Sequence, residues 1–126
     1  MKATREVIDT YYRTSGSDWD TWLTLFDDNA VIEDQLEGQI EGIAAVRSVV
    51  DVFRRGYSRF KMTPVHVVVE GQQACVVWHC EAANAAGVPI DAHGANYFHI
   101  VGGKIVRMID FHDTVPFQPF ANQDLS

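Results

Sequence analysis

The sequence lacks the marks of secreted, membrane-spanning and nucleotide-binding proteins. Its N-terminus has no basic region followed by an apolar segment and a cleavage site, and no stretch approaches the roughly 18 apolar residues of a membrane span. It contains neither a glycine-rich phosphate loop nor a Gly-x-Ser-x-Gly nucleophile motif. We therefore expect a cytoplasmic protein that binds no membrane and uses neither nucleotide nor serine-hydrolase chemistry.

Cysteine and basic residues are also scarce. The two cysteines, Cys75 and Cys80, lie in one predicted strand, which places their Cα atoms roughly 16 Å apart. A disulfide tolerates at most ~7 Å, so both are expected to be free thiols, which suits the cytoplasm. Ten Lys and Arg against seventeen Asp and Glu give a net charge of −7, which repels a phosphate backbone. We predict no nucleic-acid partner.

The remaining composition is that of a small globular protein. Hydrophobic residues make up 47% of the 126 residues and charged residues 21%, which fits a single domain with one core. Helical spacing of apolar residues is confined to the first half of the chain. It predicts a helix that ends at Gly16, a short aromatic helix that begins at Ser17 and reaches Asp27, and a third helix over residues 43–57.

Alternation of apolar and polar residues dominates the second half. The short turns between the predicted strands indicate antiparallel hairpins, and the three N-terminal helices supply the cover that such a meander needs on one face. The expected fold class is α+β, a single domain over residues 1–126 with an irregular C-terminal tail over 114–126. In that tail, Phe117 and Phe120 are candidates to close over a pocket or to meet a partner chain. The predicted strands cover residues 30–34, 63–69, 74–83, 90–101 and 104–113.

Four segments of the chain resemble those of one protein group. They are the aromatic run from Trp19 to Phe26 and the stretches DDNAVIEDQLEG, GIAAVRSVVDVF and GGKIVRMIDFHD. Up to Asp113 the chain resembles the SnoaL-like and ketosteroid isomerase-like family of the nuclear-transport-factor-like superfamily. The resemblance implies a cone-shaped barrel, in which a curved antiparallel sheet is covered on its concave face by the three helices. It also implies an enzyme of the ketosteroid isomerase or polyketide cyclase type, which moves a proton at carbon in a hydrophobic pocket without a cofactor.

Asp34 ends the segment DDNAVIED, which resembles the isomerase segment whose final aspartate is the general base. Proton abstraction beside a carbonyl leaves an enolate oxygen that needs fixed hydrogen-bond donors. By the same resemblance, Asn96 lies near the position of a protonated aspartate, and Tyr11 or Tyr12 lies near the tyrosine position. An amide donates a hydrogen bond but supplies no proton, which departs from the steroid enzymes. Without the resemblance, Asp34 is equally well interpreted as a strand-end carboxylate that caps a turn.

Asp110 and His112 form a second candidate acid–base pair. Strand alternation places both on one face of the last strand with Met108, and an aspartate in this strand of SnoaL-like cyclases, which is catalytic there, resembles Asp110. The alternative is that the pair only stabilises the end of the sheet, and whether Asp34 or Asp110 is the base stays open. Asp110-x-His112 needs a third ligand to bind a metal, and the other histidines lack metal-site spacing. We expect neither a metal nor a cofactor.

Large apolar side chains are predicted to form the walls of a pocket for a hydrophobic small molecule, although core packing explains any one of them as well. On the outer face of the sheet we expect His79, His99, Tyr97, Ile105 and Ile109, a mixed surface that favours a homodimer. The predicted substrate-binding residues are Trp22, Phe26, Phe53, Trp78, Phe98 and Met108.

Two other kinds of function fit the same residues. Dehydration and epoxide opening use similar groups, so a dehydratase or an epoxide hydrolase is an alternative within the same pocket. A non-catalytic module that binds a small ligand or dimerises is the other alternative. In such a module Asp34 is expected to be exposed or held in a salt bridge.

Overall fold

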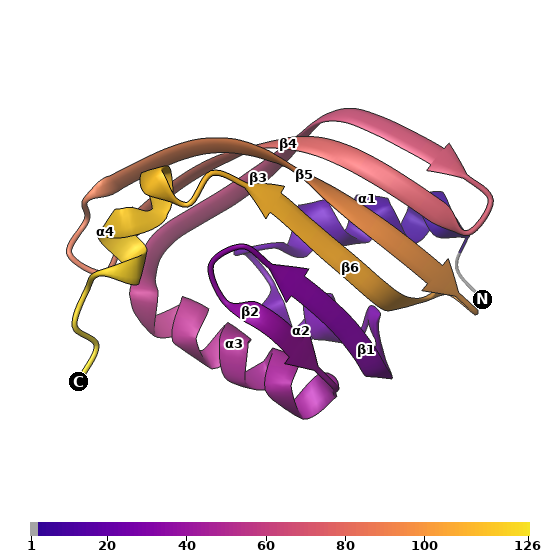
Figure 1. Cartoon of the computed structure of the whole chain (residues 1–126), viewed down its shortest axis with the longest axis horizontal. Helices are drawn as coiled ribbons and strands as arrows, with labels where there is room; N and C mark the ends of the chain where they lie inside the picture. The colour runs from indigo at the N-terminus through magenta and orange to yellow at the C-terminus, as the bar shows by residue number, and fades with distance from the viewer. Residues whose placement is uncertain (1–2) are drawn as a thin grey trace.

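A strongly curved sheet with open edges organises the chain (Figure 1). The computed structural model describes residues 3–126. Within them the strands are β1 (Phe26–Asp34), β2 (Gly38–Glu41), β3 (Tyr57–Glu70), β4 (Gln73–Asn84), β5 (Pro89–Val101) and β6 (Lys104–His112). Their order in the six-stranded sheet is β2-β1-β6-β5-β4-β3. All neighbouring pairs are antiparallel except β1 and β6, which are parallel.

The meander from β3 to β6 forms as the alternation predicted, whereas the first two strands differ from the prediction. β1 begins at Phe26, four residues earlier than predicted, and takes up Phe26 and Asp27, which the helical spacing of aromatic residues had assigned to the second helix. The register is also irregular between Phe26 and Val31, which obscures the alternation. β2 was not predicted at all. Its four residues bury only Ile40, so they carry no periodic signal. Because β1 and β6 run parallel, the sheet is mixed rather than wholly antiparallel as predicted.

The three helices that precede the meander are α1 (Thr4–Thr14), α2 (Trp19–Leu23) and α3 (Ile43–Gly56). After α1, Gly16 adopts φ 81°, and a Cβ there would lie 2.2 Å from the carbonyl oxygen of Phe60. The second helix is capped one residue later than predicted, because the side chain of Asp18 rather than Ser17 accepts the N–H of Thr21 at 3.1 Å. No helix in residues 3–126 has the length and apolar character needed to cross a membrane.

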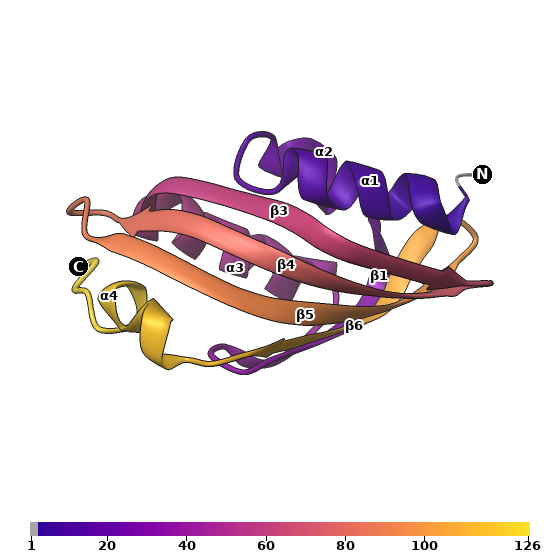
Figure 2. The same ribbon diagram turned by 90° about the horizontal axis from the view of Figure 1, so that it is seen from above.

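The core lies between the helices and the concave face of the sheet (Figure 2). Tyr11 of α1 is central to it, since its ring centroid lies 5.0 Å from that of Phe98 on β5 and 5.5 Å from that of Trp22 on α2. Trp22 in turn lies 4.6 Å from Phe26, and α3 adds the fully buried Val50. The structure confirms the cone-like α+β fold, with its apolar interior facing the helices.

The C-terminal tail, predicted to be irregular over residues 114–126, contains a 3-10 turn, η1 (Val115–Phe117), and a short helix, α4 (Gln118–Ala121). The side-chain amide of Asn84 donates to the carbonyl of Pro119 at 2.8 Å. The ring of Phe120 stacks on Tyr57 with centroids 4.2 Å apart. These contacts dock the tail at the end of the sheet beside the C-terminus of α3 (Figure 1). Two prolines in a short apolar segment concealed this helix from pattern reasoning.

The outer face of the sheet carries most of the residues expected there. His79, Tyr97 and His99 alternate with buried neighbours and are partly exposed. Ile105 was also predicted on this face, but it is fully buried opposite Ile100. A bulge between His99 and Ile100 shifts the alternation of β6 by one residue and turns Ile105 inward. Pairing of this face with a second chain stays a prediction.

Candidate active site

A mainly aromatic cavity opens between the helices and the concave face of the sheet. It encloses about 550 Å³ including its mouth, and a smaller compartment of about 370 Å³ adjoins it toward α3. The two share six lining residues, among them both carboxylates predicted to be catalytic. The main cavity is lined by Tyr11, Ser15, Trp19, Trp22, Asp34, Leu36, Glu37, Phe53, Tyr57, Phe60, Met62, Trp78, Asp110, His112 and Phe117.

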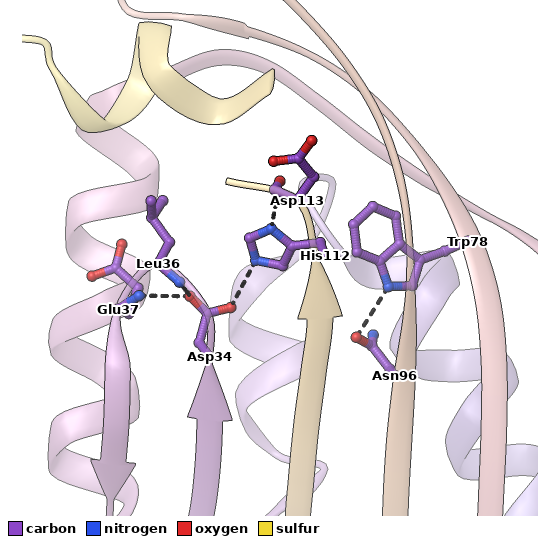
Figure 3. A network of polar contacts seen from close by, with 7 residues as sticks. All are labelled: Asp34, Leu36, Glu37, Trp78, Asn96, His112 and Asp113. Atoms are coloured by element: carbon purple, nitrogen blue, oxygen red, sulfur yellow. Dashed lines mark hydrogen bonds and ion pairs between the residues drawn. The ribbon is translucent and has the colours of Figure 1, made fainter. Parts of the chain in front are cut away.

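The parallel contact between β1 and β6 brings three ionisable side chains together in this cavity. Asp34 at the end of β1 lies directly beside Asp110 in the register of β6, and His112 follows two residues later on the same face. The Nε2 atom of His112 lies 3.3 Å from Oδ1 of Asp34 (Figure 3). One ligand atom from each of the three residues lies within 4.8 Å of the other two. The residues that were predicted separately form one cluster.

Asp34 both starts a turn and faces the cavity. Its Oδ2 atom accepts the backbone N–H groups of Leu36 at 2.9 Å and Glu37 at 2.7 Å, which initiates the turn into β2 (Figure 3). Burial raises the pKa of Asp34, but hydrogen bonds from His112, Asp110 and the Glu37 N–H outweigh it, so its pKa lies below the ordinary value. Asp34 is therefore a carboxylate at neutral pH.

His112 is the positive partner in the cluster. Its Nδ1 atom lies 3.0 Å from the carbonyl oxygen of Asp113, which only accepts, so Nδ1 carries a hydrogen. Its Nε2 atom faces the carboxylate of Asp34 and carries the second hydrogen. Burial lowers the pKa of His112, but the hydrogen bonds to Asp34 and Asp113 and the negative charge of Asp34 raise it above the ordinary value. Asp34 and His112 form a mostly buried ion pair.

The pKa of Asp110 is shifted in the opposite direction to that of Asp34. Burial is the largest cause that raises the pKa of Asp110, and the negative charge of Asp34 and the hydrogen bond to it raise the pKa further. Two adjacent carboxylates do not both ionise readily, so Asp110 retains the proton and its carboxyl group is hydrogen-bonded to the carboxylate of Asp34. The Oδ1 atom of Asp110 is buried without a hydrogen-bond partner among the described residues. The cavity thus contains a carboxylic acid, a carboxylate and an imidazolium.

Asp110→Asn is expected to stabilise the protein at neutral pH. The unfolded chain ionises Asp110 near pH ~3.9, whereas the fold keeps it protonated, so this residue lowers the free energy of unfolding as pH rises above that value. An amide removes this penalty and still donates to Asp34. We expect a gain on the order of 1 kcal/mol at pH 7, or about 3 to 6 °C in Tm, that disappears near pH 4.

Thermal melts between pH 4 and pH 7 measure this gain, with the exposed Asp28→Asn as control. A gain that is larger at pH 4 than at pH 7 contradicts the assignment.

The tyrosine and asparagine candidates separate into two groups. Tyr11 lines both compartments, and burial raises its pKa, so it stays a neutral phenol. Tyr12 and Asn96 line neither compartment. The amide of Asn96 donates to the Tyr12 hydroxyl at 2.8 Å. Its oxygen accepts the indole N–H of Trp78 at 3.0 Å (Figure 3). Both functional ends of the Asn96 amide are occupied within the core.

The residues predicted to form the pocket walls also separate into those that line a compartment and those that do not. Trp22, Phe53 and Trp78 line the main cavity, and Met108 lines the smaller compartment. The indole N–H of Trp22 is buried and has no hydrogen-bond partner in the described part of the chain, as is the case for Oδ1 of Asp110. The two remaining predicted walls lie in neither lining and pack in the core behind the cavity. They are Phe26 and Phe98.

Sequence reasoning missed several residues of the cavity lining. Tyr57 and Phe60 line it from the start of β3, a stretch that lies before the predicted beginning of this strand. Phe117, which was only a candidate to close over a pocket, lies with its ring centroid 4.8 Å from that of His112. Glu37 also lines the cavity, and burial followed by the charge of Asp34 raises its pKa. A longer predicted strand would have found the first two residues.

The cluster also offers ligands for a metal, since Asp34 is the third ligand that Asp110-x-His112 required. Two features disfavour a cation there. Oδ2 of Asp34 already accepts two backbone N–H groups, and Asp110 retains a proton that a metal would have to displace. The expectation that the site works without a metal stays a prediction.

The chain belongs to the SnoaL-like domain family, whose model matches residues 7–108. No curated protein matches the sequence. A candidate polyketide cyclase from Pseudomonas putida has a TM-score of 0.85 at 17% identity, over 93% of this chain and 96% of that one. A Catenulispora acidiphila protein with a ketosteroid isomerase-like fold, in complex with trimethylamine, scores 0.81 at 12% identity, over 95% of both chains. TerC, co-crystallised with polyporic acid, scores 0.82 at 18% identity, over 95% and 98%. Such identities show a shared fold.

Proposed function

We propose that the protein is a cofactor-independent enzyme that moves a proton at carbon in a small, ring-containing carbonyl compound, as ketosteroid isomerases and polyketide cyclases do. The observation that carries this proposal is the cluster of Asp34, Asp110 and His112 in an aromatic cavity. Two carboxyl groups whose surroundings drive their pKa values apart provide a base and an acid in one site. The membership of a family with cyclase-like and isomerase-like relatives supports the same class of reaction.

Asp110 is the acid in this proposal. In the free protein its proton is shared with Asp34, and its Oδ1 atom has no partner. A ligand carbonyl that enters the cavity accepts the proton of Asp110 in a hydrogen bond. Asp34 then loses one of its donors, so its basicity rises when the ligand arrives. The neutral phenol of Tyr11 and the indole N–H of the neighbouring Trp22 are further donors for the same oxygen.

Asp34 is the base. It takes a proton from the carbon beside the ligand carbonyl, and the electrons of the broken C–H bond form an enolate whose oxygen is held by Asp110 and Trp22. Return of the proton from Asp34 to a different carbon isomerises the ligand. Attack of the enolate carbon on a second carbonyl closes a ring instead, and the alkoxide formed from that carbonyl takes up the proton held by Asp34. The imidazolium of His112 orients Asp34 through its Nε2–H, and the Asp113 carbonyl holds the ring.

The protonated state of Asp110 also favours a second reaction class. An acid that protonates an epoxide or hydroxyl oxygen, next to a carboxylate that activates water or removes a proton, supports epoxide opening or dehydration. The groups and the cavity are the same as in the first proposal, and only the ligand differs. Candidate ligands therefore have to include epoxides and hydroxy ketones as well as enolisable ketones.

The test measures proton exchange and turnover across a panel of cyclic ketones, hydroxy ketones and epoxides. Incorporation of deuterium from D2O beside a ketone, followed by NMR, detects the first step even when no product forms. We expect exchange that falls on the alkaline side of the pH profile, because Asp110 must stay protonated. Turnover of epoxides without ketone exchange favours the hydrolase instead.

A binding measurement, made alongside the exchange and turnover assays, separates an enzyme from a binding module. Quenching of tryptophan fluorescence by polyporic acid, the compound co-crystallised with TerC, probes occupancy of the cavity independently of any reaction. Trp19, Trp22 and Trp78 all line the cavity and report on it. Binding without exchange or turnover of any panel member, unchanged in Asp34→Asn, contradicts the catalytic proposal and favours the non-catalytic alternative.

A further inference from the structure

A second cluster of ionisable side chains lies on the outer face of the sheet, away from the cavity. His79 on β4 is directly opposite His93 on β5, and the next outward-facing pair along the same two strands is Glu81 opposite Asp91. Two imidazoles and two carboxylates therefore form a two-by-two array. Their inward neighbours, Trp78 and others, face the opposite side of the sheet. The proposed function makes no use of this array.

The contacts within the array bring potential ligand atoms close together. Nε2 of His79 lies 3.0 Å from Oδ1 of Asp91, and Nδ1 of His79 lies 3.8 Å from Oε1 of Glu81. The rings of His79 and His93 are stacked with their centroids 4.4 Å apart and 8° between their planes. One ligand atom each from His79, Asp91 and His93 lies within 4.8 Å of the other two.

From this geometry we propose that His79, Asp91 and His93 bind a divalent transition-metal ion such as Zn²⁺ on the outer face of the β4–β5 hairpin. Imidazole nitrogen and carboxylate oxygen are ligands that Zn²⁺ accepts, at ~2.0 to 2.2 Å each. Two ligand atoms on a tetrahedral ion with such bonds lie about 3.3 to 3.5 Å apart. The 3.0 Å between His79 and Asp91 is already near this separation.

The remaining ligand needs only a local movement. His93 is exposed, so its ring is free to turn out of the stack and direct a nitrogen at an ion beside His79 and Asp91. The side chain of Asp91 is 69% exposed, which leaves room for the ion and for water as a fourth ligand. Glu81, with its carboxylate near the other nitrogen of His79, is placed to orient that ring rather than to bind the ion. The ion would join two neighbouring strands and is structural in character.

Zinc titration of chelator-treated protein by calorimetry at pH 7.5 tests the site. We expect one Zn²⁺ per chain, a rise in Tm on addition of the ion, and shifted ring resonances of His79 and His93 in histidine side-chain NMR spectra. His93→Ala and Asp91→Ala should each weaken binding about tenfold or more, because each removes a ligand rather than an outer partner. His99→Ala, which removes another histidine of the outer face, should leave the affinity unchanged.

The inner cluster of Asp34, Asp110 and His112 is the competing location for the ion. Binding that survives in His93→Ala but is lost in His112→Gln assigns the ion to the cavity and overturns the outer site. One ion per two chains also overturns it, because three ligands of one chain are then not the site. The outer site is also overturned if zinc produces no heat and no shift of the His79 and His93 resonances. None of these outcomes depends on the proposed catalytic activity.

Discussion

Asp34→Asn is expected to slow proton transfer at carbon by about 10²- to 10⁴-fold, the range that a positioned general base contributes. The amide keeps the shape of the side chain but cannot accept the proton. It also removes the negative charge that holds a proton on His112, so the pKa of His112 should fall toward its ordinary value. Rates of deuterium exchange and the histidine NMR titration measure the two effects in the same variant.

Two comparisons make this prediction specific to the assigned roles. Asp28→Asn changes an exposed carboxylate on the same strand and should leave the rate unchanged. Asp110→Asn retains a hydrogen-bond donor to the ligand oxygen, so its loss of rate should be smaller than that of Asp34→Asn. If Asp110→Asn is instead the more damaging substitution, Asp110 is the base and the assignment of the two residues is reversed.

Asn96→Leu should destabilise the fold by about 3 kcal/mol, equivalent to a fall in Tm on the order of 10 °C. Leucine has the same branching and number of side-chain heavy atoms but leaves the Trp78 indole N–H and the Tyr12 hydroxyl without a partner in the core. Chemical denaturation with fixed pH measures the loss. Tyr12→Phe removes only one of these two hydrogen bonds, so it should lower the stability less. Asn29→Leu changes an exposed amide and should have little effect on stability.

This variant also tests the role that the family resemblance implied for Asn96. If the amide only holds the core together, kcat of the folded variant, measured well below its Tm, stays close to that of the wild type. A large loss of kcat in fully folded Asn96→Leu would restore Asn96 as a donor to the ligand oxygen. A loss of stability below about 1 kcal/mol would show that the buried chain of hydrogen bonds does not stabilise the fold.

Local patterns predicted the elements that are stabilised by neighbours close in sequence. The strands of the meander and the third helix were placed within a few residues, except that β3 begins six residues before its predicted start. β2 and α4 were missed, because four-residue elements bury too few side chains to show a period. Ile105 was assigned to the wrong face, because alternation alone does not reveal a bulge.

The residues of the candidate site could be predicted from the sequence, but their arrangement in space could not. Resemblance identified Asp34, and resemblance together with alternation identified Asp110 and His112, all of which line one cavity. No sequence pattern indicated that Asp34 and Asp110 are direct neighbours, because a parallel strand contact leaves no local signal. Their opposite pKa shifts follow from the burial of Asp110, from the hydrogen bond between His112 and Asp34, and from that contact. The engagement of Asn96 with Trp78 and Tyr12 was equally hidden, since it depends on three distant elements.

The parallel contact between β1 and β6 also ties chemistry to the order of folding. Asp34 and His112 lie 78 positions apart in the sequence, whereas the hairpins of the meander close over short turns. Contacts between distant segments form more slowly than hairpins, because the entropy of closing a long loop is lost before the contact gives stability in return. A chain emerging from the ribosome therefore has no acid–base pair until its last strand docks beside its first. Regain of activity during refolding would report the completion of the topology rather than the formation of secondary structure.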